Sequence, residues 1–145
     1  MSLETVSPDT SLSSVTTCKR ILFIDRDVII VNATIEGKFK FRIALDTAAT
    51  HTTIDSNVLY FSGYELKNSK GEKEIETSNG IIVVETYDIE RLECLGIVKT
   101  NFEVQVYDFL SHGITSDYDG VIGLNFLREH KFCIDIMKRE LSVDI

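Results

Sequence analysis

The strict alternation of apolar and polar residues between Lys38 and Leu45 constrains the fold of this chain more than any other feature. Every second residue is apolar, and the two interleaved sets are Phe39, Phe41, Ile43 and Leu45, and Lys38, Lys40, Arg42 and Ala44. Successive side chains of a strand point to opposite faces, so this pattern predicts a half-buried β-strand. A β-branched segment lies between Val28 and Ile35, and Glu36-Gly37 supplies a turn that folds both into a hairpin. The residue that follows this hairpin is Asp46.

Strand patterns recur along the rest of the chain, at 74–77, 81–84, 102–107 and 141–145. The first two form a predicted hairpin joined by Ser78-Asn79-Gly80, because Asn-Gly tolerates the positive φ angles of a tight turn. We expect its tip to be exposed and mobile. Helical segments are few, namely Ser56–Phe61, capped by Asp55 or Ser56, and about two turns over Leu124–Lys131. The fold class is therefore mainly β, and a small closed β-barrel is expected.

Length and composition predict one folded domain. The chain has 145 residues, 43% of them hydrophobic, which suits a single globular unit. Residues 1–18 are rich in Ser and Thr and are expected to be a flexible leader or linker, and 19–145 are expected to be the domain. No apolar run approaches the roughly 20 residues that span a bilayer, and no export signal is visible. These features fit a cytoplasmic protein or the soluble domain of an anchored one, and the sequence does not assign a compartment.

The charged residues, the cysteines and the histidines exclude several classes of function. The formal net charge is −8, and no cluster of Lys or Arg is available to neutralise phosphates, so nucleic acid is not an expected partner. The cysteines lack metal-ligand spacing and are expected to be buried or incidental thiols; they are Cys18, Cys94 and Cys133. The histidines also lack this spacing and are expected to be surface side chains; they are His51, His112 and His130. No metal and no cofactor is therefore expected.

Two distant segments carry a family resemblance. They are Ile43-Ala44-Leu45-Asp46-Thr47-Ala48-Ala49-Thr50 and Tyr118-Asp119-Gly120-Val121-Ile122-Gly123-Leu124-Asn125-Phe126-Leu127. Together they resemble the retropepsin-like aspartic proteases, in which a strand runs into Asp-Thr/Ser-Gly-Ala and a later hydrophobic-hydrophobic-Gly element leads into a short helix beneath the catalytic loop. The resemblance extends from about Ile29 to the C-terminus, with 132–145 similar to the family's closing hairpin. It implies a retropepsin-type closed barrel with one short helix near the C-terminus.

The resemblance also implies an activity and an assembly. Peptide hydrolysis by this route needs one carboxylate as a general base for water and a second, protonated one to polarise the carbonyl. Two carboxylates about 3 Å apart share one proton and titrate as a unit, which predicts a bell-shaped pH profile. The sequence has one loop of this kind, so the resemblance implies a homodimer in which Asp46 meets its symmetry mate. The implied activity is that of an aspartic endopeptidase, a hydrolase acting on peptides or proteins.

The remaining site residues follow from the same resemblance. The Thr47 hydroxyl is expected to hydrogen-bond across the dimer axis and hold both loops rigid. The backbone N–H groups of Ala48 and Ala49 are expected to stabilise the ionised carboxylate. Ser78, Asn79 and Gly80 occupy the place of the family's flap, which closes over an extended peptide and pairs with its backbone. This mechanism requires neither a metal nor a cofactor.

Ala48 departs from the family pattern, which has Gly after Asp-Thr. Alanine keeps the backbone donor, but its methyl group takes space close to the attacking water and restricts φ. One alternative function is therefore a retropepsin-like peptide-binding dimer with weak or no catalysis. A further alternative, independent of Ala48, is a β-barrel interaction domain whose resemblance is accidental.

Several residues near these motifs have plainer interpretations. Asp119-Gly120 is interpreted as a turn and not as a second catalytic carboxylate, because its flanks lack the Asp-Thr loop. Tyr107, Phe109 and Tyr118 are interpreted as filling the core or an interface and not as lining a substrate groove.

Overall fold

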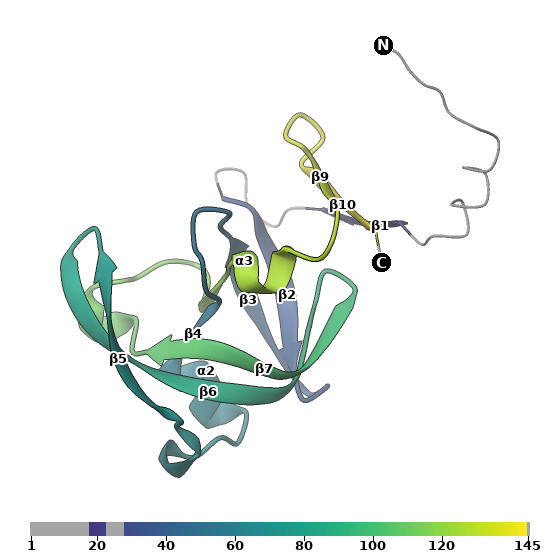
Figure 1. The fold of residues 1–145 in the computed structure, drawn as a ribbon. Helices are drawn as coiled ribbons and strands as arrows, with labels where there is room; N and C mark the ends of the chain where they lie inside the picture. The colour runs from purple at the N-terminus through teal and green to yellow at the C-terminus, as the bar shows by residue number, and fades with distance from the viewer. Residues whose placement is uncertain (1–17, 23–27, 145) are drawn as a thin grey trace.

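The computed structural model describes residues 18–22 and 28–144, and the elements within them are mainly strands (Figure 1). The strands are β1 (Cys18–Leu22), β2 (Ile30–Ile35), β3 (Phe39–Leu45), β4 (Thr53–Asp55), β5 (Gly71–Thr77), β6 (Gly80–Cys94), β7 (Ile97–Tyr107), β8 (Gly120–Ile122), β9 (Phe132–Asp135) and β10 (Glu140–Asp144). The helices are short: α2 (Ser56–Phe61), α3 (Leu124–Leu127) and the 3₁₀ turns η1 (Leu66–Asn68) and η2 (Leu110–His112). The described residues contain no helix long and apolar enough to cross a membrane.

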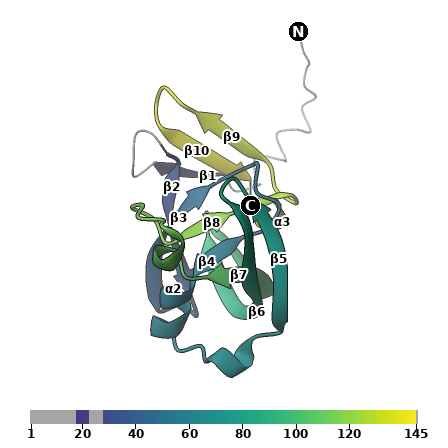
Figure 2. The same ribbon diagram turned by 90° about the vertical axis from the view of Figure 1, so that its left-hand side faces the viewer.

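Six strands close into a barrel. Their order is β2-β3-β8-β4-β7-β6, and β6 pairs back onto β2 through Ala33↔Cys94 and its neighbours. Strand β5 joins the same sheet by pairing with β6 alone, so the β5–β6 hairpin extends beyond the barrel (Figure 1). The closed, mainly β barrel predicted from the alternating segments is confirmed. A separate sheet, β1-β10-β9, lies beyond α3 at one end of the barrel (Figure 2).

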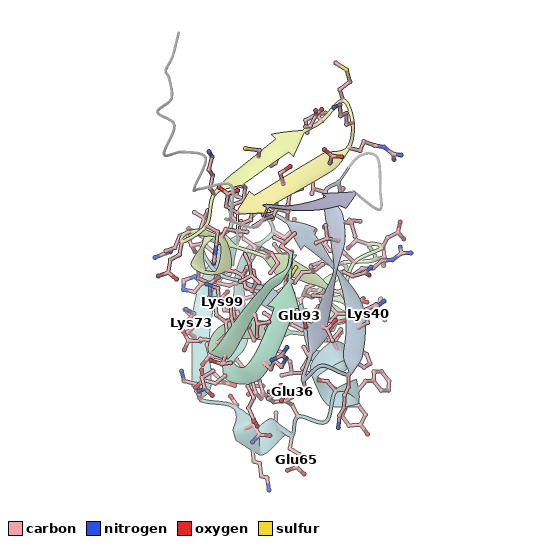
Figure 3. The ribbon with its side chains drawn as sticks, turned by 90° about the vertical axis from the view of Figure 1, so that its right-hand side faces the viewer. Glu36, Lys40, Glu65, Lys73, Glu93 and Lys99 are labelled. Atoms are coloured by element: carbon pink, nitrogen blue, oxygen red, sulfur yellow. The ribbon has the colours of Figure 1, made fainter. Side chains whose placement is uncertain are left out.

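The predicted first hairpin forms, and its turn is at the predicted Glu36-Gly37. Residues Ile30–Ile35 pair with Phe39–Ala44, and Glu36 and Gly37 both have positive φ, of 56° and 69°. The Glu36 carboxylate accepts hydrogen bonds from the Arg91 backbone N–H at 2.8 Å and the Tyr64 hydroxyl at 2.9 Å. Burial, with a contribution from this carboxylate, raises the pKa of Tyr64 to about 12. Glu36 thus ties the turn to β6 at the end of the barrel away from the three-stranded sheet (Figure 3).

The second hairpin differs in detail from its prediction. Its two-residue loop is Ser78-Asn79, because Thr77 pairs with Gly80, the first residue of β6. Gly80 takes the positive φ, 113°, and Asn79 does not. The Thr77 hydroxyl donates to the Gly80 carbonyl at 2.8 Å and accepts from the Asn79 N–H at 3.2 Å, which closes the loop.

The core lies inside the barrel and under α3. It contains the predicted inward residues of β3, Phe41 at 5% exposure and Ile43 at 0%, with Phe126 of α3 at 0%. The rings of Phe126 and Phe102 meet edge to face with centroids 5.5 Å apart. The prediction that the helix runs to Lys131 is wrong. The helix ends at Leu127. The Lys131 carbonyl accepts a hydrogen bond from the Asp144 N–H, so the residues expected to form a second helical turn lead instead into pairing with the C-terminal strand.

Candidate active site

Backbone hydrogen bonds tie the start of the loop that carries Asp46 to the barrel. At its start, the Leu45 N–H donates to the Ile29 carbonyl at 2.8 Å, and the Asp46 N–H donates to the Ile122 carbonyl at 3.0 Å. The first bond continues the antiparallel pairing of β3 with β2, and the second continues the parallel pairing of β3 with β8. The Ala49 N–H donates to the Asp46 carbonyl at 3.1 Å and tightens the turn. Asp46 therefore projects from a backbone that the sheet fixes.

Asp46, Thr47 and Ala48 are all exposed on this loop. The Ala48 N–H donates to Asp46 Oδ1 at 2.9 Å, which orients the carboxylate. The N–H of Ala49, expected at the carboxylate, instead donates to the backbone in this single chain. Among the described residues the Thr47 hydroxyl has no hydrogen-bond partner. The non-glycine residues with positive φ are Glu36, Leu95, Asn101 and Arg139, so Ala48 takes its place without left-handed strain.

A buried hydrogen-bond group that the sequence analysis missed supports the loop from below. Thr52 is 0% exposed, and its hydroxyl donates to Asn125 Oδ1 at 2.8 Å and accepts from the Gly123 N–H at 3.1 Å. The Thr52 N–H also donates to Asn125 Oδ1, at 2.8 Å. Such a group is stable only when each member is paired, because unpaired buried polar atoms are costly. The polar Asn125 inside the apolar run 121–127 was the available signal.

Gly123 permits the close approach of α3 to the loop. A Cβ atom at Gly123 would lie 2.5 Å from the His51 carbonyl oxygen and 2.9 Å from that of Ala49. The same approach lets the Leu124 N–H donate to the Ala49 carbonyl at 2.8 Å. The segment 121–124 therefore lies beneath the Asp46 loop, as the resemblance implied.

A cavity of about 450 Å³ separates the Asp46 loop from β5. Its lining residues are Ala48, Ala49, Thr50, His51, Thr53, Lys73, Glu74, Ile75, Glu76 and Gln105. The hairpin tip, Ser78-Asn79-Gly80, is exposed and does not line the cavity, whereas the stem of β5 does. Figures 1 and 2 place this tip at the end of the barrel where the chain turns from β3 to β4. Lys73 extends from β5 at the edge of the molecule (Figure 3).

Two other aspartates near the site have structural roles. Asp55 is 8% exposed, and its carboxylate caps α2 and accepts from the Phe109 N–H at 3.2 Å. Burial is the larger cause, and the negative charge of Asp55 the smaller, that raises the pKa of Asp119. The positive charge of Arg42 acts in the opposite direction and lowers this pKa. The predicted Asp119-Gly120 turn is wrong. Gly120 opens β8, where a Cβ would lie 3.0 Å from the Thr53 carbonyl oxygen, so the glycine serves close strand packing.

The aromatic residues near β7 lie away from the Asp46 loop. Phe109 is 4% exposed, and its ring packs on that of Tyr107 with centroids 4.9 Å apart. Tyr107 also lines a second cavity of about 380 Å³ between α2 and the β5–β7 strands, together with His112. Tyr118 is half-buried. Burial as core was therefore the correct interpretation for Phe109, whereas Tyr107 lines a cavity that is separate from the loop.

The thiols and histidines form no metal cluster in the described part of the chain. Cys94 is buried, which raises the pKa of its thiol to about 12, and Cys133 is exposed on β9. The side chain of Cys18 lies outside what the structure describes. His51 and His130 are half-buried, and His112 is exposed.

Comparison with known proteins agrees with this arrangement. A family model described as "Aspartyl protease" matches residues 31–126. The solved structure of a retropepsin-like aspartic protease from Rickettsia conorii superposes with a TM-score of 0.67 at 21% sequence identity, covering 89% of this chain and 92% of that one. No curated protein matches the chain in sequence. The match to the solved structure establishes a retropepsin-like fold.

Proposed function

The chain belongs to the aspartyl protease family, and we propose that it is an aspartic endopeptidase that acts on extended peptides as a homodimer. The observation that carries this proposal is the single exposed carboxylate on the sheet-anchored loop, Asp46. Asp55 is committed to capping α2, and Asp119 immediately precedes β8. Since the reaction needs two adjacent carboxylates, the second must come from another copy of the chain.

In this proposal the two Asp46 carboxylates meet at a two-fold axis and share one proton. The ionised one removes a proton from water, which attacks the peptide carbonyl, while the protonated one donates to the carbonyl oxygen. The Ala48 N–H, 2.9 Å from Asp46 Oδ1, supports the ionised state. The Thr47 hydroxyl, which bonds to none of the described residues, is available to bond across the axis.

The cavity between the loop and β5 supports an extended substrate. Within the described part of the chain strand β5 pairs only with β6, so its other edge leaves backbone donors and acceptors for a peptide strand. Ser78, Asn79 and Gly80 are at the tip of this hairpin, where closing over a bound peptide excludes water from the two Asp46 side chains.

We also propose the domain division. Residues 19–145 make up the protease domain, and 1–18 are a leader or linker. The pairing of β1 with β10, which joins Cys18–Leu22 to Glu140–Asp144, supports a domain that includes the C-terminal strand, and it begins at Cys18, one residue before the proposed boundary. The adjacent β9 and its loop expose Ile134, Ile136 and Met137 at 40%, 69% and 93%, apolar surface that a second copy can cover.

Ala48 favours one alternative, a peptide-binding dimer that hydrolyses weakly. The residue keeps its backbone donor, but it is exposed and lines the cavity, so its methyl group occupies space in the substrate groove. In that case the groove binds peptides, and the attacking water has too little room.

A peptide library with the variant Asp46→Asn distinguishes these functions. The proposal predicts cleavage by the wild type, none by Asp46→Asn, and unchanged cleavage by Asp117→Asn, which alters an exposed aspartate outside the loop. Peptide binding without cleavage from about pH 4 to about pH 8 favours the weak or inactive dimer. A dimer structure that holds the two Asp46 carboxylates far apart contradicts both.

A further inference from the structure

One buried polar side chain in the cavity beside the Asp46 loop has no hydrogen-bond partner among the residues that the structure describes. Gln105 is 5% exposed, and its backbone N–H donates to the Thr52 carbonyl at 2.9 Å. Within residues 18–22 and 28–144 its side-chain amide makes no hydrogen bond. Buried polar groups in folded proteins are nearly always paired, because a buried amide without a partner destabilises the fold. The position of this amide therefore needs an explanation outside the described chain.

The neighbours of Gln105 place it at the cavity and not in the core. On β7 its neighbours Val104 and Val106 belong to the core cluster, and the alternation of the strand turns Gln105 to the opposite face. In the sheet it is paired with Thr53 on one side and Thr86 on the other. Gln105 and Thr53 both line the 450 Å³ cavity, whose other sides are 48–51 of the loop and 73–76 of β5.

We propose that Gln105 is a specificity-determining residue that selects the side chain of Asn or Gln in a bound peptide. This inference rests on the proposed function, because it takes the cavity as part of the substrate groove. A carboxamide both donates and accepts, so its Nε2 and Oε1 atoms are both satisfied by a second carboxamide. The substrate thereby provides the partner that the described chain does not.

Other side chains fit this position less well. An aliphatic side chain leaves the Gln105 amide buried and unpaired. A carboxylate or an ammonium group satisfies only half of the amide and loses its own hydration. A site with a buried group that requires pairing discriminates against a substrate that cannot pair, and we expect a preference of about tenfold to hundredfold in kcat/KM for Asn over Leu.

The variant Gln105→Leu tests the assignment without endangering the fold. Because it removes an unpaired amide and fills the same space, the variant should unfold at the same temperature as the wild type or higher. A lower unfolding temperature would mean that Gln105 has a structural partner, and would overturn the inference. Thr100→Val, a similar loss of polarity at an exposed position of β7 outside the cavity, is the matched control.

The substrates are pairs of peptides that carry Asn or Leu at one position, scanned along both sides of the cleaved bond. We expect wild type and Thr100→Val to prefer Asn at one position, and Gln105→Leu to lose or reverse this preference. The inference is overturned if Gln105→Leu and the wild type have the same selectivity, or if the wild type cleaves without a preference for Asn. In both cases the proposed protease activity is unaffected. If the wild type cleaves none of the peptides, their binding to the Asp46→Asn variant is measured instead. Selective binding of the Asn peptides supports the inference and refutes the protease activity. Equal binding of Asn and Leu peptides, or no binding, overturns the inference.

Discussion

Replacing Thr52 by Val tests whether the buried group beneath the Asp46 loop stabilises it. Valine has nearly the same shape, so the change removes the hydroxyl alone. The Gly123 N–H, 3.1 Å from that hydroxyl, loses its acceptor, and Asn125 Oδ1 loses one of two donors at 2.8 Å. A buried unsatisfied N–H costs about 1–3 kcal/mol and a lost hydrogen bond about 1 kcal/mol, so we expect a loss of about 2–4 kcal/mol in the free energy of unfolding.

Thermal and urea unfolding measure this loss, which corresponds to a decrease of roughly 10 °C in the unfolding temperature. The matched control is Thr53→Val, the same substitution at the next residue, which is half-buried and has no side-chain hydrogen bond within the described chain. If Thr52→Val changes stability by less than about 0.5 kcal/mol, or if Thr53→Val costs as much, the role given to the Thr52 hydroxyl is wrong.

Three further substitutions probe the surroundings of the loop. Gly123→Ala should cost at least about 2 kcal/mol in urea unfolding, because its Cβ would lie 2.5 Å from the His51 carbonyl oxygen; a near-neutral result would contradict the close packing. Burial and the Asp55 charge raise the pKa of Asp119 in the folded state. Ionisation of Asp119 therefore destabilises the fold as pH rises from the pKa of the unfolded chain to the raised pKa of the folded one. Asp119→Asn should therefore gain stability over wild type as pH rises from acid to neutral, and a pH-independent difference would refute this. Ala48→Gly should lower stability by up to about 1 kcal/mol while raising kcat/KM, and unchanged turnover would show that the methyl group is no obstacle.

The strands and the Asp46 loop were predictable because local patterns specify them. Alternation from Lys38 to Leu45 defines one strand whose inward residues must be buried, and the Glu36-Gly37 turn fixes its register with the strand before it. The Ser56–Phe61 helix was likewise predicted with correct bounds, because the capping signal lies within a few residues, and of the two predicted cap residues, Asp55 and Ser56, it is Asp55 that caps the helix.

The features that escaped prediction depend on contacts between distant segments. Thr52 and Asn125 are 73 residues apart, and nothing local at Thr52 marks it as buried. Gln105 is a polar residue between the core residues Val104 and Val106, and nothing local shows that it is 5% exposed and lines the cavity between β5 and the Asp46 loop. Gly120 reads locally as half of an Asp-Gly turn, and only pairing with β3 and β4 places it in a strand.

The central claim is that each active site contains one Asp46 from each of two chains. The most direct test is the activity of mixtures of wild-type and Asp46→Asn chains. The chains are mixed at constant total concentration, allowed to exchange, and assayed for peptide cleavage. If each site needs two intact aspartates, an equal mixture retains about a quarter of the wild-type activity, because only dimers of two wild-type chains are active. Retention of about half, in proportion to the wild-type fraction, would mean that one chain makes a complete site and would contradict the account.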